Sequence, residues 1–195
     1  MRADAQRNYD RLLAEARQAF IVHGTDASLE DIARHAGVGI GTLYRHFPDR
    51  YALMNAVFEQ EVELLTAGAE ELLTADSPTD ALVRWLRMVA VHSTMYRGLS
   101  AAIMAADEAK MVACKLPLRA AGGALLERAQ RAGEVRADAT IADLLKLTNA
   151  IVLVAEKDPE RQAIFDRLMT LALDGLRTPA GVAEAMGVAE ATAQA

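Results

Sequence analysis

The fold is decided by the stretch TDASLEDIARHAGVGIGTLYRHFPDR, residues 25–50. Ser28 stands just before an apolar pattern, and Asp31 follows three residues later. The serine hydroxyl can therefore cap a helix whose positive N-terminal end the aspartate favours. Apolar residues then recur at the spacing of one helical face, namely Leu29, Ile32, Ala33 and Ala36. We expect a short helix that begins next to Ser28.

Gly37 follows the last of these apolar residues and predicts a sharp turn. A left-handed conformation just beyond a helix end is least strained for glycine, because glycine has no Cβ. Val38 is then placed to fold back against Ala33. A second helix is expected to restart near Gly39 or Ile40.

The second helix carries Leu43 and Phe47 one turn apart, on a face that we expect to be buried, and Pro48 forbids its continuation. An upstream helix over residues 5–23 supplies the apolar floor for both. Helix, glycine turn and helix make a helix-turn-helix, whose second helix lies in the DNA major groove with its N-terminal residues at base edges. The stretch therefore predicts DNA binding.

Residues 28–53, SLEDIARHAGVGIGTLYRHFPDRYAL, resemble the tetracycline-repressor (TetR) family of transcriptional regulators. The turn glycine, Thr-Leu-Tyr, His-Phe-Pro and the start of a following helix keep their places, and Phe20 and Gly24 fit upstream. The remainder of the chain agrees with the family only in being helical. The resemblance implies an all-α fold, with an N-terminal three-helix DNA-binding domain followed by a helical-bundle domain for ligand binding and dimerisation.

Three glycines in this stretch, Gly37, Gly39 and Gly41, also suggest a phosphate-binding loop. The dinucleotide fingerprint requires G-x-G-x-x-G after a strand, but its last position falls on Thr42 and no strand precedes it. A Walker loop requires Gly-Lys-Ser/Thr, which the stretch does not contain. We therefore reject the nucleotide-loop interpretation.

Composition supports a helical protein. Hydrophobic residues make up 52% of the 195 residues and aromatic residues 5%, with alanine and leucine dominant. No continuous apolar segment has membrane-spanning length, and charged residues interrupt the first turns where a signal peptide would be apolar. We expect a cytoplasmic protein that binds no membrane.

The sequence offers no candidate for catalysis. It contains no G-x-S-x-G elbow, and Cys114, the one cysteine, has no partner at metal-ligand spacing. We interpret Cys114 as a small apolar side chain. No catalytic residue, metal or cofactor is expected, and an enzyme that merely carries a helix-turn-helix is rejected.

The net charge of −6 is unevenly distributed. Residues 1–50 hold seven arginines and seven acidic residues, so the excess negative charge lies in the rest of the chain. A near-neutral head can still bind DNA, because individual arginines, backbone N–H groups and helix N-termini make phosphate contacts. The acidic body would repel DNA elsewhere and help to orient the head.

Further helices are expected downstream, about nine in all. The first of them is expected from Asp49 to about residue 74, and the second from Ser77-Pro78 to Gly98. Two more are expected over residues 99–112 and 117–133, and the last two after Asp138 and after Asp158-Pro159. The last two, residues 140–156 and 160–176, are apolar over more than one face. The resemblance implies that they form a symmetric dimer, while a central core helix stays open as an alternative.

The resemblance assigns DNA phosphate contacts to five residues: Thr25, Ser28, Tyr44, His46 and Arg50. Base contacts would come from residues 39–45, where the sequence departs from the commoner Ser-Lys or Ser-Arg pattern. Ile40 is suited to a thymine methyl, Thr42 to a base edge or methyl, and Arg45 to a guanine. Gly39 and Gly41 would instead let the helix backbone approach DNA closely and leave part of the specificity to DNA shape.

Methionine and aromatic residues gather in segments that enclose an effector pocket in TetR-like proteins. They are Trp85, Met88, His92, Met95, Tyr96, Met104 and Met111. A stripe of methionine and aromatic residues at helical spacing is more often plain core, and that alternative stays open for each of them.

These patterns predict a ligand-responsive regulator, most simply a repressor, that binds an inverted repeat as a homodimer and is released by a largely apolar small molecule. The DNA-binding domain would span residues 1–47, the effector and dimerisation domain 48–178, and a tail without assigned function 179–195. Two alternatives stay open: a helical interaction module, and an activator that uses the same helix-turn-helix.

Overall fold

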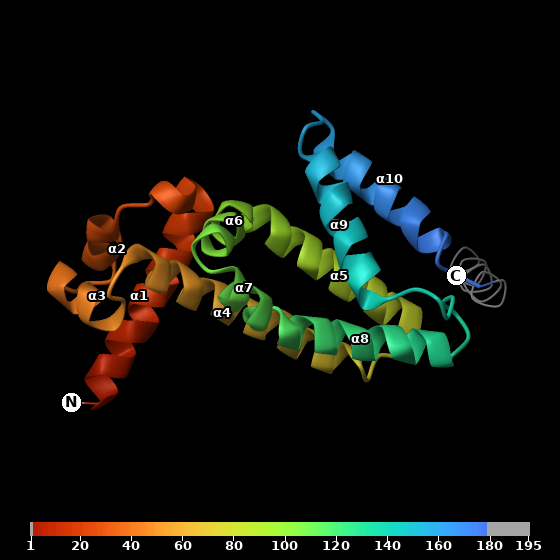
Figure 1. Ribbon diagram of the computed structural model, residues 1–195, viewed down its shortest axis with the longest axis horizontal. Coiled ribbons are helices and arrows are strands. Elements are labelled where there is room, and N and C mark those ends of the chain that lie inside the picture. Colours follow the sequence, from red (N-terminus) through yellow and green to blue (C-terminus); the bar gives the residue numbers. More distant parts are fainter. Residues whose placement is uncertain (1, 179–195) are drawn as a thin grey trace, which may run out of the picture. The chain divides into compact units, whose positions relative to one another are not determined.

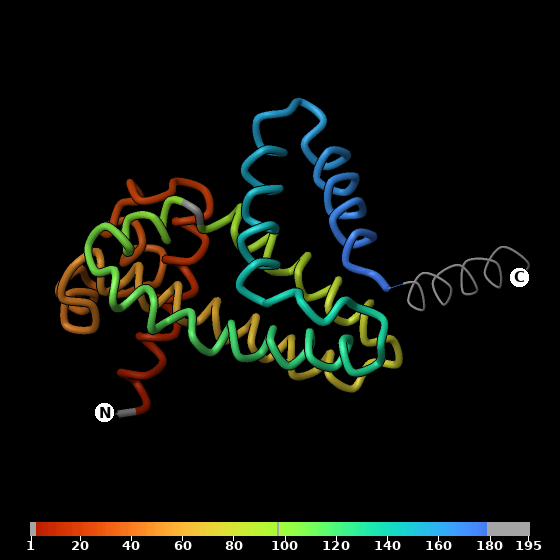
Figure 2. The backbone as a smooth tube through the Cα atoms, turned by 45° about the vertical axis from the view of Figure 1, so that its right-hand side comes forward, coloured from red at the N-terminus to blue at the C-terminus, as the bar shows by residue number. Residues whose placement is uncertain are grey.

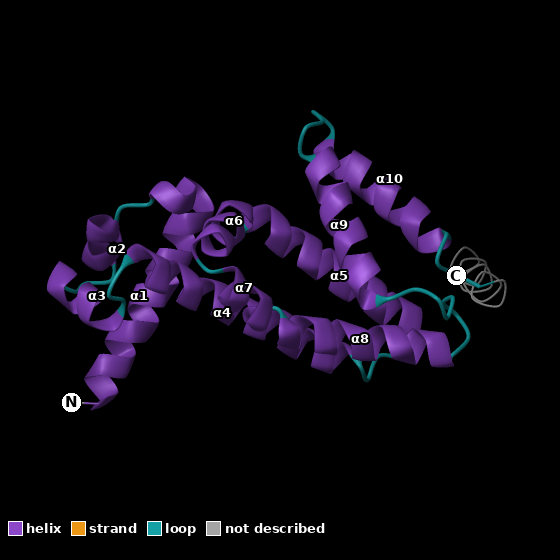
Figure 3. Ribbon diagram, viewed as in Figure 1, coloured by secondary structure: helices purple, strands orange, loops and turns teal. Residues whose placement is uncertain are grey.

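The structure is a computed structural model that describes residues 2–178, excepting the side chains of Arg2 and Arg97. Over this range the backbone forms helices, loops and no strand, apart from one isolated bridge between Val135 and Arg177 (Figure 3). The elements are α1 (Arg2–His23), η1, a 3-10 turn (Gly24–Asp26), α2 (Leu29–His35), α3 (Ile40–His46), α4 (Arg50–Leu72), α5 (Pro78–Met95), α6 (Arg97–Ala106), α7 (Glu108–Cys114), α8 (Leu116–Arg131), α9 (Ile141–Ala155) and α10 (Arg161–Asp174). The predicted all-α class is confirmed.

The segment predicted as one helix over residues 99–112 is two helices, so that prediction was wrong in its continuity. Asp107 leaves the helical conformation, and its carboxylate accepts a hydrogen bond from the backbone N–H of Lys110 at 2.9 Å. This is an N-cap, which begins α7 where α6 has just ended. The described residues therefore hold ten α-helices.

The last two helices begin within one residue of the predicted ranges 140–156 and 160–176, but Asp138 and Asp158 do not cap them as predicted. Thr140 caps α9, because its Oγ1 accepts from the N–H of Asp143 at 3.3 Å, whereas Asp138 pairs with Arg136. Asp158 accepts from the N–H of Glu160 at 2.8 Å and so orders the turn that precedes α10. In both places an earlier aspartate stabilises the loop, and the helix begins later.

The chain divides into two compact units. The first comprises residues 1–63 and 94–116, and the second comprises residues 64–93 together with the chain from 117 onward. Helices α1, α2 and α3 therefore fold with α6 and α7 (Figure 1). The domain boundaries predicted after residues 47 and 178 stay predictions, and the tail 179–195 lies outside the described residues.

In the first unit, α2 packs against α1 and α3 against α2 (Figure 1). Their inward side chains form an apolar core that includes Leu12, Phe20, Ile32 and Leu43, and Leu53 at the start of α4 is buried too. The two motif helices thus rest on α1, as the sequence predicts.

In the second unit, Trp85 of α5 is fully buried, and its indole N–H donates to the carbonyl oxygen of Leu65 at 2.9 Å. The ring lies against Gly122 of α8, where no side chain stands in its way. Helices α9 and α10 form an antiparallel pair, seen in both views of the backbone (Figures 1 and 2). None of the helices in residues 2–178 has the length and apolarity to cross a membrane.

Candidate nucleic-acid interface

The turn between α2 and α3 has the geometry that its glycine predicts. The Oγ of Ser28 accepts from the N–H of Asp31 at 3.1 Å and caps α2. At the other end Gly37 has a φ of 69°, and its N–H donates to the carbonyl of Arg34 at 3.1 Å. The N–H of Val38 donates to the carbonyl of Ala33 at 3.0 Å. Together these bonds form a Schellman motif, which fixes the direction of α3.

Helix α3 is anchored through one face. Leu43 and Phe47 are buried, as the sequence predicts. The ring of Tyr9 in α1 stacks on Phe47, with ring centroids 5.0 Å apart, and meets the edge of His46 at 5.9 Å. An aromatic cluster therefore holds the C-terminal end of α3 against α1.

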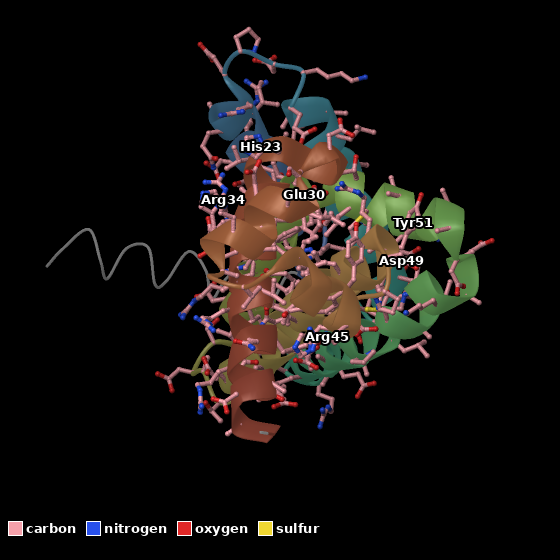
Figure 4. All side chains as sticks on the ribbon, turned by 90° about the vertical axis from the view of Figure 1, so that its left-hand side faces the viewer. His23, Glu30, Arg34, Arg45, Asp49 and Tyr51 are labelled. Atoms are coloured by element: carbon pink, nitrogen blue, oxygen red, sulfur yellow. The ribbon has the colours of Figure 1, made fainter. Side chains whose placement is uncertain are left out.

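The opposite face of α3 is open to solvent. The side chain of Ile40 is 37% exposed and that of Tyr44 is 45% exposed. Thr42 is half-buried, and Arg45 is exposed, at the surface seen in Figure 4 together with Glu30 and Arg34 of α2. Apolar, hydroxyl-bearing and cationic side chains of α3 are thus at least partly accessible to solvent.

Glycines make the first turn of this helix unusually bare. A Cβ added to Gly39 or to Gly41 would meet no atom within 4 Å, other than those of its own helix and chain neighbours. Arg45 leans back toward the same turn, because its Nε donates to the carbonyl of Gly41 at 3.3 Å. The exposed backbone and the arginine head are therefore neighbours.

The other predicted phosphate contacts have partners within the protein. The hydroxyl of Ser28 is engaged in the helix cap, and Thr25 lies half-buried in η1. Arg50 directs Nη1 to the carbonyl oxygens of Thr25 and Ala27, at 2.8 and 2.6 Å. Sequence reasoning missed this contact, since backbone carbonyls leave no signal in the residue types.

Arg34 was not among the predicted contacts and adds a cation to the surface of α2. It pairs with Asp31 one turn earlier, and this hydrogen bond holds the pKa of the Asp31 carboxyl below its usual value. Asp31 and Arg34 are three residues apart on one helical face, so this ion pair could have been predicted from the sequence.

A buried polar cluster lies deeper in the first unit. Glu61 of α4 and Tyr96 are both buried, and Arg17 of α1 reaches them. The Nε of Arg17 pairs with Glu61 and donates to the Tyr96 hydroxyl at 3.1 Å. Burial, and then the charge of Glu61, raise the pKa of Tyr96 to about 12.

Two family models match the chain. Residues 12–57 match the family described as bacterial regulatory proteins, tetR family, and residues 77–178 match the family described as transcriptional regulator SbtR-like, C-terminal domain. The chain belongs to the TetR family of transcriptional regulators. Regulators of this family bind DNA and dimerise, and their effector ligands bind in the C-terminal domain.

Solved structures of the TetR family are similar to the chain over most of its length. The TetR transcriptional regulator SCO0520 from Streptomyces coelicolor shares 37% identity, with a TM-score of 0.72 over 87% of this chain and 98% of that one. The TetR regulatory protein from Mycobacterium vanbaalenii shares 36% identity, with a TM-score of 0.68 over 91% and 99% of the two chains.

A curated protein is similar to the chain over a shorter region. An HTH-type transcriptional regulator from Staphylococcus aureus strain MRSA252 is 32% identical over 79 residues, or 39% of this chain. The chain spans 41% of the length of that relative.

The residues predicted for a TetR effector pocket differ widely in burial. Met88, Met95 and Met104 are exposed, and His92 is half-buried. The fully buried members are Trp85 and Met111, with Tyr96 also buried. Trp85, Met88 and His92 belong to the second unit, whereas Met95, Tyr96, Met104 and Met111 belong to the first. Their role in an effector site stays a prediction.

The α9–α10 pair has apolar side chains on two sides. One set is buried within the second unit and includes Leu144, Val152 and Met169. Another set faces solvent and includes Leu147, Leu153, Val154 and Leu171, of which Leu171 is 63% exposed. Burial agrees with the core interpretation for the first set, whereas an interface at the second set stays a prediction.

Proposed function

We propose that this TetR-family chain is a ligand-responsive repressor that binds an inverted-repeat operator as a homodimer and is released by a small-molecule effector. The observation that carries the proposal is the outer face of α3. That face is exposed, and the capped turn before α3 and the aromatic cluster at its end hold the helix in place. A rigid helix with a bare first turn is suited to the major groove.

The reading of bases is assigned to the first turns of α3. Ile40 contacts a thymine methyl, Thr42 a base edge or methyl, and Arg45 the O6 and N7 of a guanine. Gly39 and Gly41 allow the helix backbone to approach the bases, because no side chain projects there. Sequence preference beyond these contacts then comes from DNA shape.

Phosphate contacts flank this face. We assign them to the hydroxyl of Tyr44 and the ring of His46 at the end of α3, and to Thr25 and Ser28 before α2. The first N–H groups of α2 add a partial positive charge at the same place. Removal of one hydroxyl in Tyr44→Phe should weaken operator binding, and undiminished binding would argue against this assignment.

Dimerisation is assigned to residues 140–156 and 160–176, the α9–α10 region. Its exposed leucines and valine are apolar side chains that a partner could cover, as in protein interfaces. Leu171→Glu should convert the dimer to a monomer in sedimentation velocity. Leu116→Glu, at a leucine of similar exposure in α8, is the matched control and should leave the dimer intact.

Release of the operator would follow from the spacing of the two DNA-binding domains of a dimer on one duplex. The half-sites of such an operator lie about 34–36 Å apart, so a change in the separation of the two α3 helices removes the match. An effector acts when it binds the mismatched state better than the matched one. The methionines predicted for the pocket suit a largely apolar effector.

The test is in-vitro selection of duplexes from a random pool by the purified, ligand-free chain at moderate salt. The proposal predicts an enriched inverted repeat whose half-sites are about one helical turn apart. The Arg45→Ala variant should lose preference at one base position while it keeps the others. Failure of the unmodified chain to enrich any sequence would overturn the proposal and favour a helical interaction module. A promoter-reporter fusion then distinguishes repression from activation.

A further inference from the structure

Three polar side chains form a largely buried cluster that joins α1 to two other parts of the first unit. They are Arg17 of α1, Glu61 of α4 and Tyr96, which directly precedes α6. Arg17 pairs with the Glu61 carboxylate through Nε, and its Nη2 donates to Oε2 of that carboxylate at 3.4 Å. The same Nε donates to the Tyr96 hydroxyl at 3.1 Å. The side chain of Glu61 is 8% exposed and Tyr96 is 2% exposed, so both groups are shielded from water.

The cluster stands where the chain leaves and re-enters the first unit. The chain passes to the second unit inside α4, after Glu63, and returns inside α5, after Ser93. Glu61 lies just before the first of these points, and Tyr96 lies just after the second. Arg17 therefore connects α1, on which α2 and α3 rest, to two segments that lead into the second unit.

Inside the second unit, a hydrogen bond joins the continuations of the same two segments. The indole N–H of Trp85 in α5 donates to the carbonyl oxygen of Leu65 in α4 at 2.9 Å. Leu65 follows Glu61 by one helical turn, so the two residues are neighbours on one face of α4, and both are buried. One turn of helix therefore links the Arg17 cluster to Trp85, the one tryptophan of the chain.

We infer that the cluster of Arg17, Glu61 and Tyr96 couples the helix-turn-helix to the second unit, so that DNA binding and the state of that unit depend on each other. This inference rests on the proposed binding of DNA. Coupling between distant sites is carried by packed side chains, hydrogen-bond networks and rigid helices. It is also reciprocal, because an effector that changes operator affinity from the second unit requires that the operator changes that unit in turn. Operator DNA is therefore a sufficient probe of the coupling.

A paired substitution breaks the cluster without burying a lone charge. Arg17→Met alone would leave the Glu61 carboxylate buried without its cation, which destabilises proteins strongly. The paired variant Arg17→Met/Glu61→Leu removes both charges and keeps apolar groups of similar volume, an exchange that folded proteins often tolerate. Tyr96→Phe is a milder variant that removes one hydroxyl. Arg7→Met is the matched control, because Arg7 is another arginine of α1 and pairs with Asp4 at an exposed site.

Binding and coupling are measured in one titration with the selected operator duplex. The fluorescence anisotropy of labelled DNA reports binding, and the emission of Trp85 reports the second unit. Operator binding should shift this emission in the unmodified chain and in Arg7→Met. The paired variant should bind the operator with its Trp85 emission unchanged, and Tyr96→Phe should show a smaller shift than the unmodified chain. A cluster with a merely structural role would lower stability and leave the full shift at saturating operator.

Several results overturn the inference. A full emission shift in the paired variant at saturating operator is one, and an unmodified chain that binds the operator without any shift is another. A paired variant that folds but binds no operator would show that the cluster serves DNA binding itself. If the paired variant does not fold, a full shift in Tyr96→Phe has the same meaning. An unmodified chain that binds no operator is a failure of the proposed function instead.

Discussion

Two helical glycines, Gly41 of α3 and Gly122 of α8, have opposite surroundings. A Cβ on Gly122 would stand 2.3 Å from the Trp85 ring and 2.9 Å from the side chain of Ile141. A Cβ on Gly41 would meet nothing within 4 Å. Glycine within a helix costs about 1 kcal/mol relative to alanine in either place. Close packing explains why residue 122 is a glycine, whereas no contact within the folded chain explains why residue 41 is one.

The difference separates residues selected by the core from residues available for function. Gly122 makes room for the largest side chain of the second unit, so its identity follows from the shape of that core. Gly41 lies between Ile40 and Arg45 on the face proposed to meet DNA. Places where a local preference is broken without a structural gain are candidates for function.

The largest loss of stability is expected for Trp85→Ala. The ring is fully buried and its N–H is bonded to the Leu65 carbonyl, so the variant loses apolar contacts and leaves a cavity. We expect the free energy of unfolding to fall by about 3–5 kcal/mol. Urea denaturation followed by circular dichroism measures it. A loss below about 1 kcal/mol would mean that this ring is not the centre of the core.

Gly122→Ala tests the close approach itself. The added methyl must displace the Trp85 ring, and overpacking of this kind costs about 1–3 kcal/mol. A Cβ on the neighbouring Gly123 would meet nothing within 4 Å, so Gly123→Ala is the matched control and should stabilise the protein by up to about 1 kcal/mol. If both variants had equal thermal stability, the packing explanation for Gly122 would be wrong.

Two buried aromatic residues, Trp85 and Tyr96, differ in the same way in their surroundings. Trp85 bonds to a backbone carbonyl, whereas the Tyr96 hydroxyl lies in an ionic cluster and has its pKa raised to about 12, first by burial and then by Glu61. A raised folded-state pKa stabilises the fold fully below pH 10, the ordinary tyrosine value, and this contribution is lost as the pH rises toward 12.

The unmodified chain should therefore lose stability between pH 10 and 12 more steeply than Tyr96→Phe. Chemical denaturation at a series of alkaline pH values checks the prediction. Parallel pH profiles for the two proteins would show that Tyr96 titrates in the folded state as it does in the unfolded chain.

The sequence predicted what is local. Ser28, Gly37 and Pro48 act through their own backbone neighbours, so the helix-turn-helix and its turn could be inferred from residue order. The capping residue of α9 was harder to predict, because Asp138 and Thr140 both suit a helix start. Only the pairing of Asp138 with Arg136 decides between them.

Contacts distant in the sequence could not be predicted. The residue type of Trp85 suits a pocket and a core position equally, and its close fit against Gly122 could not be inferred from the residue order. Arg50 has the charge of a phosphate contact, and its carbonyl partners carry no mark in the residue types. For both side chains, tertiary neighbours set the environment.

Gly41→Ala tests the proposed approach of the α3 backbone to DNA most directly, when thermal stability and operator affinity are measured on the same preparation. Alanine should raise the free energy of unfolding by up to about 1 kcal/mol, since the added methyl has open space. The same methyl should weaken binding to the selected operator by about tenfold, because it stands between the α3 backbone and the bases. Gly123→Ala should share the first effect without the second. A Gly41→Ala protein that is more stable and binds the operator undiminished would show that the bare first turn of α3 is not needed for DNA binding.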